Sequence, residues 1–496
     1  MTMPDTATVA EAVDAATRLE RDSLGTQQVP VNAYYGVHTV RAMENFPISG
    51  IPVSTYPEFV NALAAVKQAA AAANHELGLL DASRKDAIVD ACREIRSGRL
   101  HDQFVVDVIQ GGAGTSTNMN ANEVIANRAL ELIGSDRGDY SVLHPLEHVN
   151  RSQSTNDVYP TAIKVALQGH IASLRATLLE VSAAFARKAD EFQSVLKMGR
   201  TQLQDAVPMT LGQEFSTYAV MVTEDAERLQ EAARLVSEIN LGGTAIGTGL
   251  NAHPRYARVV CEQLTAITGH PLSTACNLVE ATQDVGAFVH VSGVLKRTAL
   301  KLSKICNDLR LLSSGPRSGF NEINLPAVQP GSSIMPGKVN PVIPEVVNQV
   351  AFEVVGNDVT ISMAAEGGQL QLNAFEPIIA HCLFQSLTHL QAACRTLVAR
   401  CIDGITANRQ HLLASVTNSI GVITALSPYI GYAESARIAK TALRTGRPIP
   451  ELIVEEGMLS SAQVTALLSP ESLTSPRELL SLTAVGTPPA RKDTAS

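Results

Sequence analysis

The chain has no tryptophan, and only 4% of its 496 residues are aromatic. Hydrophobic residues still make up 45% of the chain and charged residues 18%, so Ala, Leu, Val and Ile must fill most of the core. This composition is typical of soluble, ordered chains, and small aliphatic side chains suit closely packed helices. A chain of this length normally forms two or three domains, unless long helices share one elongated core.

The sequence also lacks the usual signals for nucleic acids and membranes. The formal net charge is −9 and no basic block occurs, which argues against nucleic-acid binding and against attraction to an anionic membrane surface. The start, MTMPDTATVAEAVDAATRLE, has no basic segment followed by an apolar one, and no later stretch of about 18 apolar residues is free of polar interruption. We therefore expect a cytoplasmic protein with no nucleic-acid partner and no membrane segment.

The cysteines form no C-x-x-C pair and have no histidine partner at zinc-site spacing. There are seven of them, an odd number scattered along the chain: Cys92, Cys261, Cys276, Cys306, Cys382, Cys394 and Cys401. Buried free thiols are the simplest interpretation. We expect neither a metal nor a cofactor.

Apolar residues repeat at helical spacing in several long segments. From Ile163 to Phe185 they recur in steps of 4, 4, 3, 4, 3 and 4, which places one stripe on one helix face. From Phe288 to Leu312 the same spacing holds if Thr298 fills one gap, and this predicts a rod of roughly 37 Å. Similar patterns run through two later segments, 345–363 and 377–399, whereas period-two alternation is scarce. The sequence therefore predicts an all-α (mainly α) architecture with a central bundle of long helices.

Pro, Gly and Asn concentrate between these helical segments, which predicts loops or helix starts at 110–122, 145–160, 197–213, 241–254 and 314–344. Because loops on a rigid scaffold commonly carry binding and catalytic groups, we expect the site there. Both ends of the chain have the composition of loose tails, namely the first twenty or so residues and the final TAVGTPPARKDTAS. We leave both out of the fold prediction.

Two glycine motifs resemble nucleotide-binding loops but do not fit them. In segment 331–341, GSSIMPGKVNP, five residues separate the two glycines, Pro336 removes an N–H donor, and Val339 follows the lysine where a P-loop needs Ser or Thr. Segment 247–252, GTGLNA, matches G-x-G-x-x-A but follows no β-branched strand. Segment 331–341 instead combines two hydroxyls, a cation and a carboxamide.

Four further segments are rich in short polar side chains: GGAGTSTN at 111–118, RSQSTNDVYP at 151–160, GRTQLQD at 199–205, and Gln371, Asn373 and Glu376. Helix capping alone explains segment 151–160, although a capped N-terminus also presents free N–H groups to an anion. Taken singly, each segment is more often a solvated or capping segment than a site. Together they indicate a small-molecule anion site built from distant loops, with hydroxyls and amides as donors and few cations.

These segments closely resemble those of the aspartase/fumarase superfamily, and the resemblance extends from about Arg18 to Pro470. Segment 331–341 resembles the signature loop that closes over the substrate in related enzymes. Three other stretches match the remaining regions of that active site: 110–129, 153–162 and 199–215. The resemblance implies a three-domain fold, with an N-terminal helical domain at 1–154 (1–17 a loose tail), a central helical bundle at 155–410 that forms the tetramer core, and a small C-terminal helical domain at 411–496.

Within the superfamily the chain resembles the aspartase branch. The YYGVHT run at 34–39 and segments 110–127 and 197–215 carry this likeness. Fumarases tend to have a histidine implicated in handling water at the position of Gln202. The resemblance implies a cofactor-free carbon–nitrogen lyase that reversibly deaminates L-aspartate to fumarate and ammonia. A class II fumarate hydratase and a non-catalytic structural protein on the same scaffold are the alternatives, and Gln371 stands where we expect a glutamate.

The resemblance also implies roles for individual residues. Ser332 would be the general base that removes a Cβ proton, with Lys338 and backbone N–H groups stabilising its oxygen. Substrate binding would fall to seven residues: Thr115, Ser154, Thr155, Asn156, Thr201, Gln202 and Asn340. The four hydroxyls in this set would donate to the enediolate, while Lys338 and the two asparagines would hold the α-carboxylate and amine. Each site would draw on three subunits of a homotetramer.

Overall fold

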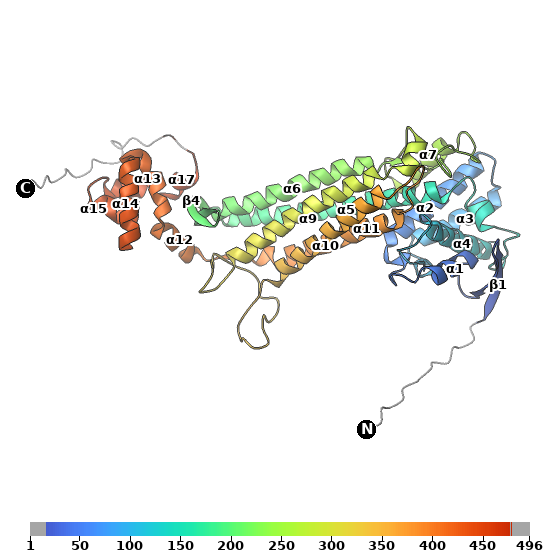
Figure 1. Cartoon of the computed structure of the whole chain (residues 1–496), viewed down its shortest axis with the longest axis horizontal. Coiled ribbons are helices and arrows are strands. Elements are labelled where there is room, and N and C mark those ends of the chain that lie inside the picture. The colour runs from blue at the N-terminus through green and yellow to red at the C-terminus, as the bar shows by residue number, and fades with distance from the viewer. Residues whose placement is uncertain (1–15, 477, 479–496) are drawn as a thin grey trace, which may run out of the picture. The chain divides into compact units, whose positions relative to one another are not determined.

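The computed structural model of the chain describes residues 16–476 and 478. These residues form two compact units, each built from three stretches of the chain. The first unit extends to Arg175 and adds Glu227–Arg297 and Phe352–His389; the second comprises Ala176–Ala226, Thr298–Ala351 and the residues from Leu390 onward. Five long helices have residues in both units: α5 (Thr155–Glu191), α6 (Leu211–Leu235), α9 (Gly286–Leu312), α10 (Val342–Glu366) and α11 (Glu376–Arg400) (Figure 1).

The long helices occur where the apolar periodicity predicts them. Helix α5 contains the whole stripe from Ile163 to Phe185, and helix α9 contains the stripe from Phe288 to Leu312. All the apolar side chains of both stripes are buried, and Thr298 is buried in the gap of the second. Helices α10 and α11 cover the two later patterned segments. The predicted mainly helical fold class with a bundle of long helices is therefore confirmed.

Buried polar contacts show that α9 and α10 are neighbours within each unit. In the first unit, Ser292 Oγ of α9 donates to Asp358 Oδ1 of α10 over 2.8 Å. In the second unit, Asn348 Nδ2 of α10 donates to Ser303 Oγ of α9, also over 2.8 Å. Because these groups are buried, each hydrogen bond fixes the register of the two helices as well as satisfying polar atoms.

The first unit contains a hairpin and a set of shorter helices: β1 (Thr17–Asp22), β2 (Gly25–Pro30), α1 (Val37–Asn45), α2 (Pro57–Glu76), α3 (Ala82–Arg96), α4 (Thr115–Leu132), α7 (Tyr256–Thr268) and α8 (Leu278–Gln283). A two-stranded parallel pair, β5 (Glu238–Ile239) and β6 (Ser273–Thr274), lies beside α7. Helix α2 packs against both α3 and α7, and most of its alanines are buried. Small side chains let helices approach closely, so the buried alanines of α2 allow the close helix packing that the composition predicts.

The second unit combines the hairpin β3 (Leu196–Thr201) and β4 (Gln204–Thr210) with the pair β7 (Ile323–Asn324) and β8 (Thr406–Ala407). Its C-terminal helices are α12 (Arg409–Asn418), α13 (Ile423–Ile430), α14 (Tyr432–Thr445), α15 (Ile449–Glu455), α16 (Ser461–Leu467) and α17 (Pro470–Thr474). Leu196 and Met198 of β3 belong to one hydrophobic core with Leu426 of α13 and other apolar residues of these helices. This shared core fixes the base of the hairpin.

Two hairpins correct the sequence prediction. Residues 197–213 were expected to form loops or helix starts, but β3 and β4 occupy most of that range and only Leu211 onward is helical. Four consecutive residues of β3, Leu196 to Gly199, are buried, so burial does not alternate along the strand. Strand β1 begins at Thr17, which was expected to be the last residue of a loose N-terminal tail. The rest of the expected tails, residues 1–15 and 483–496, lies outside the described residues.

The cysteines are free thiols, and all except Cys276 are buried, as expected. In the described part of the chain, no single helix is long and apolar enough to cross a membrane. One bent pair, Arg409–Asn418 with Ile420–Ile430, has sufficient length and apolar composition. Side chains of this pair, including Val416 and Leu426, are buried in the core of the second unit. The division into three domains stays a prediction.

Candidate functional site

The glycine-rich segment of the first unit ends at the start of helix α4. Gly114 caps this helix with φ +87°, and a Cβ atom there would lie 2.4 Å from the Tyr159 ring, so only glycine fits. Thr115 is the first helical residue; it is exposed, and its Oγ1 donates to the Gly112 carbonyl over 2.7 Å. The tight turn therefore presents the Thr115 hydroxyl at a helix N-terminus, where the helix dipole favours an anion.

The buried Asp157 organises the start of helix α5. Its Oδ1 accepts the Ser154 N–H over 2.9 Å, and its Oδ2 accepts the N–H groups of Gly242 and Thr244 over 3.0 and 2.9 Å. Burial raises the pKa of Asp157 to about 6, while the three N–H donors act in the opposite direction. The Asp157 carboxylate thereby joins the 242–244 turn to the half-buried residues 154–156 at the start of α5.

A fully buried lysine lies beneath this helix start. Lys67 Nζ donates to Asn150 Oδ1 over 2.9 Å and to Gln153 Oε1 over 3.0 Å. Burial lowers the pKa of Lys67 to about 7, and the negative charge of nearby Asp157 partly offsets that effect. Sequence reasoning missed Lys67 because it lies within an alanine-rich helical segment. The one signal in the sequence is that Lys67, followed by Gln68, interrupts a run of small apolar residues in α2.

A carboxamide links the two helix starts. Asn118, one turn into α4, donates from Nδ2 to Thr155 Oγ1 over 3.0 Å. The Asn156 side chain is directed elsewhere, since its Nδ2 donates to the Ala245 carbonyl over 2.7 Å. The first unit therefore brings together the four expected residues of segments 115 and 154–156, with Asn156 engaged in holding the 242–245 turn.

In the second unit, Ser332 lies in the 331–340 loop with its oxygen facing two backbone donors. Ser332 Oγ accepts the N–H of Ile334 over 3.2 Å and the N–H of Met335 over 3.0 Å. Two N–H groups directed at one hydroxyl oxygen stabilise negative charge on that atom. The resemblance implies backbone donors to this oxygen when the loop closes, and that Ser332 is the base stays a prediction.

The base of the same loop is closed by short contacts. The Gly331 N–H donates to the Lys338 carbonyl over 2.8 Å, and Asn340 Nδ2 donates to the Gly331 carbonyl over 2.7 Å. A Cβ atom at Gly331 would lie 2.4 Å from the Lys338 carbonyl oxygen, so this closure requires glycine. Residues 333–339 form the exposed part of the loop, which includes the side chain of Lys338.

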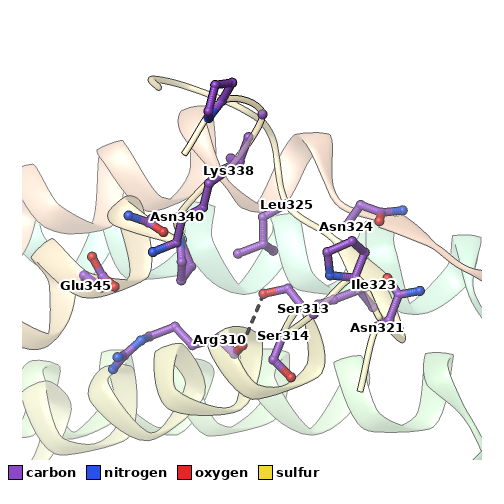
Figure 2. A pocket seen from close by; sticks show the side chains of 16 residues that line it. Arg310, Ser313, Ser314, Asn321, Ile323, Asn324, Leu325, Lys338, Asn340 and Glu345 are labelled. Carbon is purple, nitrogen blue, oxygen red and sulfur yellow. Dashed lines mark hydrogen bonds between the residues drawn. The ribbon is translucent and has the colours of Figure 1, made fainter. Parts of the chain in front are cut away.

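Lys338 and Asn340 line a cavity of about 790 Å³ in the second unit (Figure 2). Its other polar lining residues are Arg310, Ser313, Ser314, Asn321, Asn324 and Glu345. In the view of Figure 2, Arg310, Asn340 and Glu345 lie on the left and Asn321 and Asn324 on the right. Sequence reasoning missed Arg310 and Glu345 because both belong to long helices, whose pattern indicates packing. The volume is in the range of about 300–1,000 Å³ that is usual for small-molecule pockets.

Thr201 and Gln202 lie at the tip of hairpin β3–β4. Thr201 pairs with Gln204, which leaves a two-residue turn formed by Gln202 and Leu203. Both turn residues have positive φ, +54° and +62°, a conformation that hairpin turns normally reserve for Asn and Gly. All four residues are exposed. The hairpin therefore presents the Thr201 hydroxyl and the Gln202 amide at a strained, solvent-facing tip.

The expected site residues thus fall into one group in the first unit and two segments in the second. That the three come together in one site stays a prediction. Across residues 16–476 and 478, no cluster of three or more His, Cys, Asp or Glu side chains has the arrangement needed to hold a metal ion.

The chain matches two family models, one described as lyase over residues 25–356 and one described as fumarase C C-terminus over residues 422–475. Three similar curated proteins are named aspartate ammonia-lyase. The protein of Pseudomonas aeruginosa is 60% identical to this chain, and the match spans 93% of this chain and 98% of the relative. Those of Helicobacter pylori and Escherichia coli are 57% and 53% identical; each covers 92% of this chain, and the matches span 98% and 96% of the relatives.

Two solved structures resemble the fold closely. A structure described as fumarate lyase:delta crystallin from Brucella melitensis bound to cobalt has a TM-score of 0.91 and 55% identity, covering 93% of this chain and 100% of its own. A class II fumarase from Schistosoma mansoni has a TM-score of 0.87 and 36% identity, covering 92% of this chain and 98% of its own. The sequence likeness is therefore greater to the ammonia-lyases than to this fumarase.

Proposed function

The chain belongs to the aspartate ammonia-lyase family of the fumarase/aspartase superfamily, and from this premise we propose how its residues deaminate L-aspartate. It is a carbon–nitrogen lyase whose reaction converts L-aspartate reversibly to fumarate and ammonia. The chemical difficulty is the Cβ–H bond, which is not acidic in water. The residues must therefore stabilise both the base and the carbanion that proton abstraction creates.

Ser332 is the general base of this proposal. Ser332 reacts as its alkoxide: the oxygen takes the Cβ proton and becomes a hydroxyl, and the electrons of the broken C–H bond move into the adjacent β-carboxylate to give an enediolate with two negative charges. The protonated amine then leaves Cα with the electron pair of the C–N bond as ammonia, the double bond of fumarate forms, and the β-carboxylate regains its ordinary charge. The observation that carries the proposal is the pair of N–H groups, from Ile334 and Met335, directed at Ser332 Oγ.

The enediolate needs donors that are already in place. Thr115, Ser154, Thr155 and Thr201 supply hydroxyls for it, and Lys338 with Asn340 and Asn156 holds the α-carboxylate and amine end, with Gln202 beside them. One preorganised donor of this kind typically contributes about 3–4 kcal/mol to lowering the barrier. A general base alone accelerates a reaction by about 10²–10⁴-fold. The donors are therefore as important to the rate as the base.

The enzyme is proposed to be a homotetramer in which three subunits complete each site. Support comes from an apolar face of helix α10, where Phe352, Val359 and Met363 are 66%, 56% and 71% exposed. Gly356 lies on the same face, because the four residues 352, 356, 359 and 363 follow one another at steps of 4, 3 and 4. The space next to Gly356 is open, since a Cβ atom added there would have no neighbour within 4 Å. An exposed seam with this spacing fits the face of another long helix, and a second copy of the chain offers one.

The reaction is tested by incubating the purified protein with L-aspartate and, separately, with L-malate, while the ultraviolet absorbance of fumarate is followed. Fumarate should appear with L-aspartate and be accompanied by an equal amount of ammonia. Turnover of L-malate alone would assign the protein to hydration, and no turnover of either substrate would favour a structural role for this scaffold.

A further inference from the structure

A buried ion cluster lies beneath hairpin β3–β4 in the second unit. Lys197 is 1% exposed, and its Nζ lies 2.6 Å from Glu214 Oε2 and 2.6 Å from Glu322 Oε2. The other carboxylate oxygen of Glu322, Oε1, lies 2.5 Å from Arg200 Nη1. Glu322 is therefore paired with two cations at once, and both of them belong to strand β3.

The backbone of Glu322 is fixed independently of these ion pairs. Its N–H donates to the Leu312 carbonyl at the end of α9, and its carbonyl accepts the Asn408 N–H, each over 2.9 Å. The residues on either side of it, Asn321 and Ile323, line the cavity that contains Lys338. A carboxylate anchored beside this cavity thus holds the strand that ends in Thr201 and Gln202.

The hairpin tip needs such an anchor. A left-handed conformation costs about 1–2 kcal/mol for each non-glycine residue, and the turn contains two in succession, Gln202 and Leu203. A two-stranded hairpin is by itself marginally stable. The hydrophobic core holds the other end of β3, whereas near the tip Arg200 packs its guanidinium 4.2 Å from the centre of the Phe320 ring and pairs with Glu322.

We infer that Glu322 is a positioning residue for the deamination, which acts through Lys197 and Arg200 to hold Thr201 and Gln202 in place without touching the substrate. The inference rests on the proposed function, since it assigns these two residues to substrate binding. Displacing a binding group by about 1 Å can lower a rate by about 10²-fold even when the substituted residue is remote from the chemistry. Loss of the Glu322 charge should therefore lower kcat more than it raises KM.

Two variants test this inference. Glu322→Gln preserves shape, leaves Lys197 paired with Glu214, and leaves the partly exposed Arg200 able to reach water, so the fold should persist. The double variant Lys197→Met with Glu214→Gln removes one cation and one anion together, which cuts one of the two links without leaving a buried charge unpaired. We expect kcat to fall about 10- to 100-fold in Glu322→Gln and by less in the double variant.

Amide hydrogen exchange of peptides covering 196–210 supplies a readout that needs no substrate. Exchange in this hairpin should accelerate in both variants, with Glu322→Gln showing the larger effect. The matched control is Lys296→Met with Asp358→Asn, which removes another ion pair (2.5 Å) between α9 and α10 of the first unit, one with a buried carboxylate and a partly exposed lysine. This control should lower the thermal midpoint while leaving kcat and exchange at 196–210 unchanged.

The inference is overturned if Glu322→Gln remains folded with the kcat and hairpin exchange of the parent protein. It is equally overturned if Glu322→Gln loses only thermal stability, as the control does, because that result shows a structural role alone. If the parent protein forms no fumarate from L-aspartate, the proposed function fails by itself. Accelerated exchange in Glu322→Gln would then still show that this carboxylate holds the hairpin.

Discussion

Replacing Ser332 with alanine removes one oxygen atom from an exposed loop. Its two hydrogen bonds, to the N–H groups of Ile334 and Met335, are both solvent-exposed, so water replaces the lost acceptor and stability should change by less than about 1 kcal/mol. The rate should respond very differently. A general base contributes about 10²–10⁴-fold, and no other residue of the loop offers an oxygen held by two N–H donors. We expect kcat for L-aspartate to fall at least about 10³-fold.

The neighbouring hydroxyl provides the control. Ser333 lies in the same loop and is exposed, so Ser333→Ala makes the same chemical change one residue away. Initial rates of fumarate formation should be measured for both variants, with circular dichroism and light scattering to establish equal folding and assembly. The base assignment is wrong if Ser332→Ala keeps more than about a tenth of the parent rate, or if Ser333→Ala loses as much activity.

Asp157→Asn replaces a carboxylate oxygen with an NH₂ group that faces backbone N–H donors, so urea titration should show a loss of about 2–4 kcal/mol, and an unchanged midpoint would contradict the role of these contacts. Phe352→Glu places charge on the exposed seam of α10 and should convert tetramers to smaller species in light scattering, with loss of activity; an active tetramer would argue against this seam. Leu203→Gly relieves a left-handed residue that is 64% exposed, and should stabilise the protein by up to about 1 kcal/mol while lowering kcat; a kcat equal to that of the parent would show that the tip need not be rigid. Burial raises the pKa of Glu376 to about 8, partly offset by Lys164, so the folded state holds this proton more tightly than the unfolded state and the fold loses stability as pH rises from about 4.5 to 8. Glu376→Gln removes this dependence on pH. The thermal midpoint of the variant should therefore exceed that of the parent by an amount that grows between about pH 5 and 8, and the free energy of unfolding should differ by at most about 1.4 kcal/mol more for each pH unit. If the thermal midpoints of the two proteins change in parallel with pH, the raised pKa of Glu376 is refuted.

The long helices could be predicted from the sequence because each buries one continuous stripe. In the stripe from Ile163 to Phe185 the apolar residues recur every three or four positions, and every one of them is buried in α5. The hairpin β3–β4 could not be found in this way. Leu196 to Gly199 are buried in succession, since the strand packs into the C-terminal core and onto the ion cluster, and the apolar–polar alternation of its sequence ends after Met198, too soon to predict a strand.

The polar residues of the candidate site were accessible to sequence reasoning, because hydroxyls and amides concentrated in glycine-rich segments are conspicuous; their role as donors stays a prediction. The choice of reaction depended on the resemblance, in which Gln202 indicated deamination in place of hydration. The relatives confirm that choice. Arg310 and Glu345 were not found, because a charged residue on a long helix is usually a solvated one, and only the structure shows that these two line a cavity.

Two buried lysines that sequence reasoning missed share a physical role. Two of the donor segments lie next to a buried lysine: Lys67 binds the carboxamides of Asn150 and Gln153 just before segment 154–156, and Lys197 binds Glu322 from the strand that leads to Thr201. A buried ammonium is costly unless neighbouring groups satisfy it, so it fixes those groups firmly. A neutral hydroxyl stabilises an enediolate only if it does not have to reorient when the charge appears. In the proposed mechanism the two buried lysines therefore supply rigidity that the exposed loops lack, so that a site with few cations of its own stabilises a doubly charged intermediate.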